Sequence, residues 1–573
     1  MYCDNYRLLT FSAYDNTTSK KNHEEKDESD NKDVKYNKNE KEFLVQMFGI
    51  NEKGKTAAIY VEGFTPFFYI KVGDDWKEEQ KFNFILQLKK DMGEYYEGSI
   101  SESKLIKRKK LYGFDNNKLH TFMLIKFKNE SAMKKAKGLW YLKTKSTSAT
   151  TTNSSEYIRI LNPLGYDFNG TGTILYEAQI PPLLRLFHMK EISPSGWISL
   201  PRLKTLKHQN HTTSCDEEYT INYKDIISIP KKETIVPYKI CSFDIEASSS
   251  HGDFPLPVKN YKKLATNILE LWENNTNTNT NTNTNTNTNN TLFLKQIILS
   301  AFGFNKMDGV DLVYPKTVVD QDTIDALFIK WVSICPSTYK SNTNIDDADV
   351  LGISNIDENE DDDNDGLNND TEENNMNECI DEESTVNYKK FNFWKKKKSY
   401  TKNGSIIDLL LDKEADRDVK MNELTKTLTS VFPQLKGDMV TFIGSTFMNY
   451  GENKPYLNHC HVLGSCDKIN NVQIDCHKTE KDVLLAWSKL IQKENPDIII
   501  GYNIFGFDYQ FMYLRAKELE CERTFLQLSR NNREVCLNTN WKTGKEGLEE
   551  NTLLIASGQH DIKFVKMTGR LQI

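Results

Sequence analysis

The amino-terminal part of the chain is dominated by short runs of apolar, β-branched and aromatic residues that are bounded by Gly, Pro or charged clusters. Such runs are typical of strands. They are Phe43–Gly49, Ala57–Val61, Phe67–Val72 and Thr121–Phe127. Two other segments, Trp76–Lys90 and Ser131–Leu142, carry apolar residues at helical spacing. We therefore expect a small α+β domain here.

A second block of periodic segments begins near Tyr238. Strands are predicted at Tyr238–Glu246, Leu292–Phe304, Met439–Phe447 and Ile498–Tyr502. Helices are predicted at Ile324–Val332, Thr479–Glu494 and Phe507–Glu520. Strands interspersed with helices favour an α/β domain with a mixed sheet.

Four segments have compositions that cannot bury enough apolar surface to offset the chain entropy lost on folding. We expect disordered surface insertions at Ser19–Lys41, Thr144–Ser155, Asn274–Asn290 and Ser341–Ser384. The last of these holds 17 acidic residues and no Lys or Arg, so the net charge of −7 becomes +10 without it. A basic folded part permits a polyanionic partner.

The cysteines and the apolar runs indicate the compartment. The 10 cysteines are scattered and form no CxxC pair, and the first residues lack the order of a signal peptide. No apolar run approaches the length of a membrane helix. We therefore expect a soluble, intracellular protein in a reducing environment, with no membrane partner.

Two carboxylates lie on one face of the strand predicted at Tyr238–Glu246. In an extended chain Asp244 and Glu246 point to one side, whereas Cys241, Phe243 and Ile245 point to the other. Unpaired negative charges at the end of a buried strand are costly. Divalent cations are the natural partners, because Mg²⁺ takes oxygen ligands and a few carboxylates.

A third carboxylate, Asp508, lies where a buried strand and a turn lead into a helical stripe. At a helix start Asp508 could simply complement the helix dipole. Brought beside Asp244 and Glu246, it would instead complete a site for two metal ions. The spacing alone leaves both interpretations open.

Two short motifs here resemble those of a known family. FDIE (Phe243–Glu246) and YNIFGFD (Tyr502–Asp508) are similar to the first and second exonuclease motifs of family B DNA polymerases. The similarity to δ-type polymerases extends to Lys41–Val72, Gly196–Lys204 and His251–Ile268. The last of these segments particularly resembles the enzymes of large nucleocytoplasmic DNA viruses.

This resemblance implies an architecture and an activity. The implied architecture is a family B amino-terminal domain at 1–235, followed by a ribonuclease H-like (DnaQ-like) 3′→5′ exonuclease domain at 236–573 that is incomplete at its carboxyl terminus. The implied catalytic and metal-binding residues are Asp244, Glu246 and Asp508, holding two Mg²⁺ ions for which Mn²⁺ substitutes. The implied substrate-binding residues are Asn503 and Phe507.

The resemblance also implies partners and a place of action. The substrate would be DNA, as a primer–template with a single-stranded 3′ end. The remaining polymerase portion, in cis or in trans, and a sliding clamp would be protein partners. The protein would act in the nucleus or at a cytoplasmic viral replication site.

The chain departs from the family pattern in its last part. The third exonuclease motif, Tyr-x-x-x-Asp, and the polymerase signatures such as YGDTDS do not occur. A split gene, an interruption by an intein or frameshift, and a truncated gene model remain open as explanations. In each case we expect no polymerase activity and little or no nuclease activity from this chain alone. The alternative function is a non-catalytic DNA-binding or assembly module that docks a separately encoded polymerase portion.

Weaker signals are two basic clusters and a group of Cys and His residues. The clusters Lys107–Lys110 and Trp394–Lys398 could contact phosphates, but solvated surface charge is the simpler interpretation. The Cys and His group consists of Cys460, His461, Cys466, Cys476 and His477. Its spacing matches no standard zinc pattern, so we expect these side chains to be ordinary core and loop residues.

Overall fold

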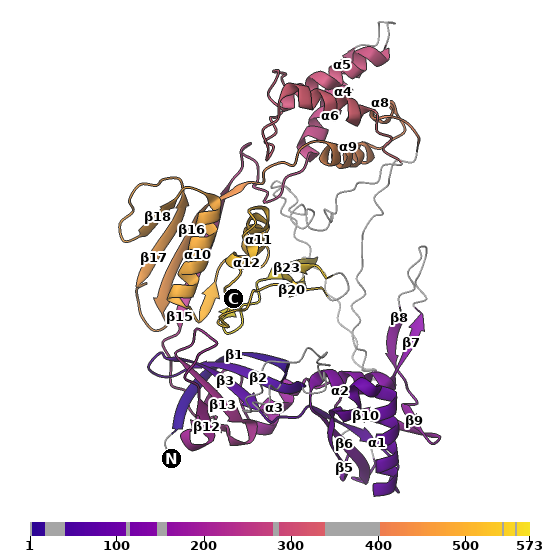
Figure 1. Ribbon diagram of the computed structural model, residues 1–573, viewed down its shortest axis with the longest axis vertical. Helices are drawn as coiled ribbons and strands as arrows, with labels where there is room; N and C mark the ends of the chain where they lie inside the picture. Colours follow the sequence, from indigo (N-terminus) through magenta and orange to yellow (C-terminus); the bar gives the residue numbers. More distant parts are fainter. Residues whose placement is uncertain are drawn as a thin grey trace, which may run out of the picture.

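The computed structural model describes residues 3–17, 41–110, 115–145, 157–278, 286–337, 402–540, 544–555 and 558–573. These residues form two amino-terminal sheets, a six-stranded sheet and a helical lobe (Figure 1). The segment Ser341–Ser384, the basic cluster Trp394–Lys398 and most of Ser19–Lys41 and Thr144–Ser155 lie outside the described residues. Within the described ranges, no helix combines the length and the apolar character that a membrane crossing requires.

The first sheet has seven strands in the order β12-β13-β3-β2-β1-β11-β14. All neighbours are antiparallel except β13 and β3, which are parallel. The strands are β1 (Cys3–Thr17), β2 (Lys41–Ile50), β3 (Thr56–Glu62), β11 (Trp197–Pro201), β12 (Thr205–Lys207), β13 (Glu217–Asn222) and β14 (Ile227–Ile229). Helix α3 (Pro182–Lys190) buries Leu186 and Phe187 in the core of this sheet.

The second sheet has five antiparallel strands in the order β5-β6-β4-β10-β9. The strands are β4 (Phe67–Lys71), β5 (Ile100–Lys109), β6 (Leu119–Phe127), β9 (Tyr166–Phe168) and β10 (Thr171–Tyr176). Helices α1 (Glu78–Met92) and α2 (Glu130–Lys137) pack on it. The strand predictions and the first helix are confirmed. The helix predicted at Ser131–Leu142 is wrong in its last part, since α2 ends before the poor helix former Gly138 and the strand pair β7 (Tyr141–Lys145) and β8 (Tyr157–Leu161) follows.

The third sheet has six strands in the order β18-β17-β16-β15-β19-β24. Strand β16 is antiparallel to both of its neighbours, whereas the other pairs are parallel. The strands are β15 (Lys239–Ser248), β16 (Met439–Asn449), β17 (Leu457–Leu463), β18 (Gln473–His477), β19 (Ile498–Ile500) and β24 (Leu571–Gln572). Helices α10 (Glu480–Glu494) and α11 (Asp508–Glu518) share its core through Trp487, Tyr509 and Phe511. The strands predicted from Tyr238, Met439 and Ile498 and the helices predicted from Thr479 and Phe507 are confirmed.

A helical lobe separates β15 from β16 in the chain and forms the upper part of Figure 1. Its helices are α4 (Lys262–Thr278), α5 (Thr286–Ala301), α6 (Gln321–Val332), α8 (Ile406–Leu411) and α9 (Arg417–Val431). The strand predicted at Leu292–Phe304 is wrong, because this segment forms most of α5. Leu294, Ile297, Ile298 and Ala301 are all buried in the lobe, which is helical spacing. Both ends of the Asn-Thr tract Asn274–Asn290 also belong to α4 and α5, so the disorder expected there is wrong at its two ends.

Small elements complete the carboxyl-terminal part and contact the first sheet. They are α12 (Glu522–Phe525), β20 (Asn538–Thr539), β21 (Glu546–Gly547), β22 (Glu549–Ile555) and β23 (Gly558–Phe564). The Gln46 side chain in β2 donates to Asn531 Oδ1 at 2.9 Å. The backbone of the segment before β13 pairs with the same region, with Ser214 N donating to Arg530 O at 2.8 Å. The amino-terminal sheet thus holds the segment that leads toward β24.

Candidate active site

The strand β15 places two of the expected carboxylates on the open face of the six-stranded sheet. Its buried and exposed residues alternate, with Cys241, Phe243 and Ile245 buried and Asp244 and Glu246 exposed. The apolar face packs against the helices, where the Phe243 ring lies 5.0 Å from Trp487 and 5.6 Å from Tyr509. The alternation that the sequence predicts for this strand is confirmed.

The neighbouring strand leaves room beside Asp244. In the antiparallel pairing of β15 with β16, Asp244 lies opposite Gly444 and Glu246 lies opposite Phe442. Directly opposite residues project to the same face. A Cβ placed on Gly444 would meet no atom within 4 Å, so the surface beside Asp244 is open to a ligand.

The third carboxylate, Asp508, is the first residue of α11 and is only 2% exposed. A tight turn after β19 brings it to β15. Gly501 permits the close approach, since a Cβ there would lie 2.9 Å from the Phe243 carbonyl oxygen. Asn503 then adopts a left-handed conformation with φ of 55°, and its carbonyl oxygen accepts hydrogen bonds from Gly506 N at 2.9 Å and Phe507 N at 3.0 Å. This turn sets the start of α11.

Asp508 and Asp244 interact directly. Burial and the nearby negative charge of Asp244 raise the pKa of the Asp508 carboxyl to about 6, although the N–H of Ile245 partly offsets them. Asp508 Oδ1 is buried and has no hydrogen-bond partner among the described residues. A buried acceptor without a partner requires an explanation. A bound cation would provide that explanation, because a positive charge favours the ionised carboxylate.

The expected three-carboxylate set is therefore brought together only in part. The structure places Asp508 against Asp244, and Glu246 follows on the same face of β15. The three carboxylates do not all approach within 4.8 Å of one another, as the ligands of a single ion would. A pair of ions would not need such a tight set, and Asp244, Glu246 and Asp508 would hold it between them. Oxygen donors of this kind fit Mg²⁺ or Mn²⁺.

The two expected substrate-binding residues have structural contacts of their own. The Asn503 side chain lies over Gly506, where an added Cβ would stand 2.3 Å from Asn503 Oδ1. The Phe507 ring is half-buried and packs 5.3 Å from Phe511 and 5.5 Å from Phe254. The role of Asn503 and Phe507 in binding substrate therefore stays a prediction.

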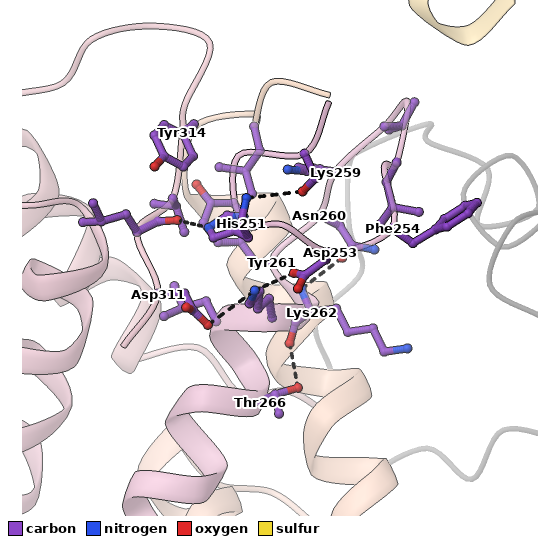
Figure 2. A pocket seen from close by; sticks show the side chains of 18 of the residues that line it. His251, Asp253, Phe254, Lys259, Asn260, Tyr261, Lys262, Thr266, Asp311 and Tyr314 are labelled. Atoms are coloured by element: carbon purple, nitrogen blue, oxygen red, sulfur yellow. Dashed lines mark hydrogen bonds and ion pairs between the residues drawn. The ribbon is translucent and has the colours of Figure 1, made fainter. Parts of the chain in front are cut away.

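A pocket of about 370 Å³ opens where β15 ends and the helical lobe begins. Figure 2 shows Phe254 on one side of this pocket and Tyr314 on the other. His251 bonds the Leu312 carbonyl oxygen at 2.7 Å, and Lys263 pairs with Asp253 at 2.5 Å. The pocket combines partly exposed rings with cationic side chains, and its lining begins at Ser249, three residues after Glu246.

Sequence reasoning did not single out the residues of this pocket. His251–Ile268 stood out only as a segment similar to a family, and no residue in it had a predicted role. Tyr502, which is 94% exposed beside the turn that positions Asp508, was also missed as a separate feature. The available signal was an aromatic residue separated from a buried isoleucine run by a single glycine, Gly501, at the start of a turn.

The basic cluster that begins at Lys107 and the Cys and His group do not lie with the three carboxylates. Lys107–Lys109 lie exposed on β5 in the second sheet. The Cys and His residues lie on or after β17 and β18, where Cys460 and His461 are neighbours on one strand and so project to opposite faces. His461 instead contacts His477, and His461 also lies close to His459 and Asp475.

Comparison with known proteins identifies the relatives of the chain. The model for the exonuclease domain of DNA polymerase family B matches residues 173–309 and 371–573. A DNA polymerase of Phaeocystis pouchetii virus is 41% identical over 99% of this chain and 52% of its own length. A DNA polymerase of Pyramimonas orientalis virus is 27% identical over 93% of this chain and 38% of its own length. The DNA polymerase delta catalytic subunit of Schizosaccharomyces pombe is 28% identical over 37% of this chain and 18% of its own length. The chain thus spans about half the length, or less, of these relatives.

Proposed function

Because this chain belongs to DNA polymerase family B and carries the exonuclease domain of that family, we propose that it is the amino-terminal and proofreading part of a replicative DNA polymerase. Its reaction would be the 3′→5′ hydrolysis of DNA ends. The observation that carries this proposal is the contact between Asp508 and Asp244. It joins the two sequence motifs in one carboxylate cluster with a buried oxygen that lacks a partner.

The strand order supports a ribonuclease H-like fold for this domain. The carboxylate strand β15 is central, with an antiparallel strand on one side and parallel strands on the other. The first two carboxylates lie on this central strand, and the third begins the helix that follows the adjacent strand. On this basis we divide the chain into an amino-terminal domain at 1–235 and an exonuclease domain at 236–573.

In this proposal Asp244, Glu246 and Asp508 would hold two Mg²⁺ ions, with Mn²⁺ as a substitute. When bound, such ions neutralise a phosphodiester and lower the pKa of a coordinated water. These three carboxylates supply a local negative charge that attracts cations, although the folded part of the chain is otherwise basic. Asp508 must lose its proton to serve as a ligand, and its pKa of about 6 in the free site makes that easy at neutral pH.

The same region supplies groups suited to a frayed DNA strand. Phe254 is 50% exposed and Tyr502 is 94% exposed, so both rings can stack on bases. Lys262, which is exposed at the pocket, can contact phosphates, whereas Lys263 is paired with Asp253 and Asp311. Asn503 and Phe507 would orient the strand end from the turn that carries Asp508. A mismatched terminus is cheaper to unpair, which would favour its entry.

Metal binding by the purified chain tests the proposal. We expect calorimetry to detect Mn²⁺ uptake that is lost in Asp244→Asn and Asp508→Asn. The matched control is Glu452→Gln, which removes an exposed carboxylate from the turn after β16 and should leave uptake unchanged. Uptake that persists unchanged in both aspartate variants would overturn the site.

DNA binding separates this function from the non-catalytic assembly module. Single-stranded DNA with a free 3′ end should bind more tightly with Ca²⁺ than with EDTA, and this difference should vanish in Asp244→Asn. DNA binding that is equally tight with Ca²⁺ and with EDTA would favour the non-catalytic assembly module. Mononucleotide release from an end-labelled strand in Mg²⁺ then tests the expectation that this chain alone has little or no nuclease activity.

A further inference from the structure

A second cluster of metal-binding side chains lies on β17 and β18, at the edge of the six-stranded sheet away from β24. His459, His461 and Asp475 each offer a ligand atom, and these atoms all lie within 4.8 Å of one another. His459 and His461 alternate along β17, and Asp475 lies opposite His461 in the parallel pairing with β18. All three therefore project to the same face of the sheet.

Short contacts link this cluster and extend it to a fourth residue. His459 Nε2 lies 3.0 Å from Asp475 Oδ2. His461 Nδ1 lies 3.0 Å from His477 Nε2. The rings of His459 and His461 are 4.3 Å apart between centroids. Four donors from two neighbouring strands thus form a continuous group.

The buried rings have donor capacity that the described residues leave unused. His459 is 4% exposed and His461 is 3% exposed. His459 Nδ1 and His461 Nε2 are both buried without a hydrogen-bond partner in the described part of the chain. The short contacts use the other nitrogen of each ring, His459 Nε2 and His461 Nδ1. A metal bound through those nitrogens would leave His459 Nδ1 and His461 Nε2 as ring N–H groups.

The cluster is accessible from solvent through its carboxylate. Asp475 adds one negative charge and is about half exposed, so the cluster has an opening toward solvent.

We propose that His459, His461 and Asp475 bind one Zn²⁺ ion. Two imidazoles and a carboxylate are ligands that Zn²⁺ accepts in four-coordinate sites that keep one position open. With metal–ligand bonds of about 2.0–2.1 Å, neighbouring donors in a tetrahedral site are about 3.3 Å apart. The 3.0 Å contact between His459 Nε2 and Asp475 Oδ2 needs only a small expansion to reach this separation.

The cysteines nearby are excluded from this site by the geometry of the strands. Cys460 lies between His459 and His461, and Cys476 lies between Asp475 and His477. Both therefore project to the opposite face of the sheet. The sequence had predicted ordinary core and loop residues here, because the spacing of the Cys and His group matches no standard zinc pattern.

The proposed ion would stabilise an edge strand of the sheet. Strand β18 has only five residues, and β17 is its one partner among the described strands. An ion shared by the two strands would add bonds that the short ladder lacks. It would stabilise this edge without taking part in chemistry at Asp244, which lies on β15.

Zinc binding by the full chain tests this proposal. After removal of metal with a chelator, the protein should bind one equivalent of Zn²⁺, and Co²⁺ in its place should give the visible absorption of a four-coordinate site. His461→Gln should weaken Zn²⁺ binding at least about 100-fold. Cys460→Ser and Cys476→Ser are matched controls on the same strands and should retain the ion. His208→Gln, which removes an imidazole bonded to Thr220 near the first sheet, should retain it too.

Two further variants keep the test independent of folding and of the proposed nuclease site. If His461→Gln does not fold, Asp475→Asn, at a half-exposed side chain, should still lower the affinity for Zn²⁺ in folded protein. Asp508→Asn should leave this zinc site intact although it abolishes Mn²⁺ uptake at the carboxylates. Absence of Zn²⁺ binding in the wild-type chain, or equal binding by the His461 and Cys460 variants, would overturn the proposal. The cluster would then be a hydrogen-bonded group that joins two strands.

Discussion

The carboxyl group of Asp508, buried at the start of α11, lies against that of Asp244 at the exposed end of β15. Two like charges in contact, one of them buried, are unfavourable without a counter-charge. The pKa of Asp508 is accordingly raised to about 6. This relationship makes the metal-free site a local source of instability at neutral pH.

Replacement of Asp508 by Asn is therefore expected to stabilise the metal-free chain. A carboxyl whose pKa is raised by folding contributes fully to stability below its unfolded pKa of about 4, and this contribution is lost as pH rises through its folded pKa of about 6. In EDTA the two proteins should be equally stable near pH 4. Above pH 6 the variant should be more stable by up to about 3 kcal/mol.

Denaturant unfolding from pH 4 to pH 8, with and without Mn²⁺, measures this effect. Added Mn²⁺ should stabilise the wild-type chain at pH 7.5 and leave Asp508→Asn unchanged, because only the wild type gains a ligand. A variant that is less stable than wild type at pH 7.5 in EDTA would contradict the expectation.

A second prediction concerns the ion pair that fixes α11 to α10. Arg515 donates to both carboxylate oxygens of Glu480, at 2.9 and 2.7 Å, and to the carbonyl oxygen of Pro257 at 3.0 Å. Arg515 and Glu480 are almost completely buried. Arg515→Ala would leave Glu480 as a buried charge without its partner and should cost about 3–5 kcal/mol. Arg515→Lys should recover only part of this, since an ammonium cannot make the paired geometry.

Arg523→Ala is the control for this prediction. Arg523 pairs with Glu546 at the surface, where both side chains are largely exposed. Its loss should change the free energy of unfolding by less than about 1 kcal/mol. Urea unfolding measures the free energy of unfolding of both variants. Similar losses of stability would show that the buried ion pair stabilises the chain no more than the exposed pair does.

Several parts of this architecture could be predicted from the sequence because they rest on local patterns. The alternation in Tyr238–Glu246 predicts which residues face the helices, since the side chains of a strand alternate strictly between two faces. It placed Asp244 and Glu246 together on the open face, where they lie. The helix start at Asp508 was likewise evident from the isoleucine run, the turn and the apolar stripe that follow one another.

Other parts depend on contacts between distant segments and could not be predicted. The apolar run around Ile297 is compatible with a buried strand or a buried helix, and only its packing in the lobe decides for the helix. The burial of the Asp508 side chain depends on how closely the turn after β19 packs against β15. The link between His461 and Asp475 requires the parallel pairing of β17 with β18, which no spacing within one strand reveals.

A third prediction contrasts two glycines, Gly437 and Gly444, neither of which has a positive φ. A Cβ on Gly437, just before β16, would lie 1.9 Å from the Pro257 carbonyl oxygen and 2.2 Å from Arg515 Nη1. Gly437→Ala should therefore destabilise the chain by more than about 2 kcal/mol. Gly444→Ala meets open space beside Asp244 and should lie within about 0.5 kcal/mol of wild type. Thermal unfolding of both variants, measured in EDTA, tests the contrast, and equal midpoints would contradict it.

The last prediction concerns Asp497, which directly precedes β19. Its side chain is 2% exposed, accepts from Arg530 Nη2 at 2.5 Å, and accepts from the backbone N–H of Lys239 at 2.7 Å. A second buried guanidinium, that of Arg570, lies close enough to Arg530 that burial and this neighbouring charge lower its pKa to about 9. One carboxylate thus balances two buried cations at the point where β24 joins the sheet.

Asp497→Asn should remove the charge that compensates Arg530 in this contact and cost about 3–5 kcal/mol. Arg530→Met in the same background should recover part of the loss, because it removes the uncompensated cation and keeps an unbranched chain in the space. A double-mutant cycle measured by urea unfolding gives the coupling between the two residues. We expect the double variant to be more stable than Asp497→Asn alone. Additive losses would mean that the two side chains act separately, and that packing rather than charge holds β19 beside β24.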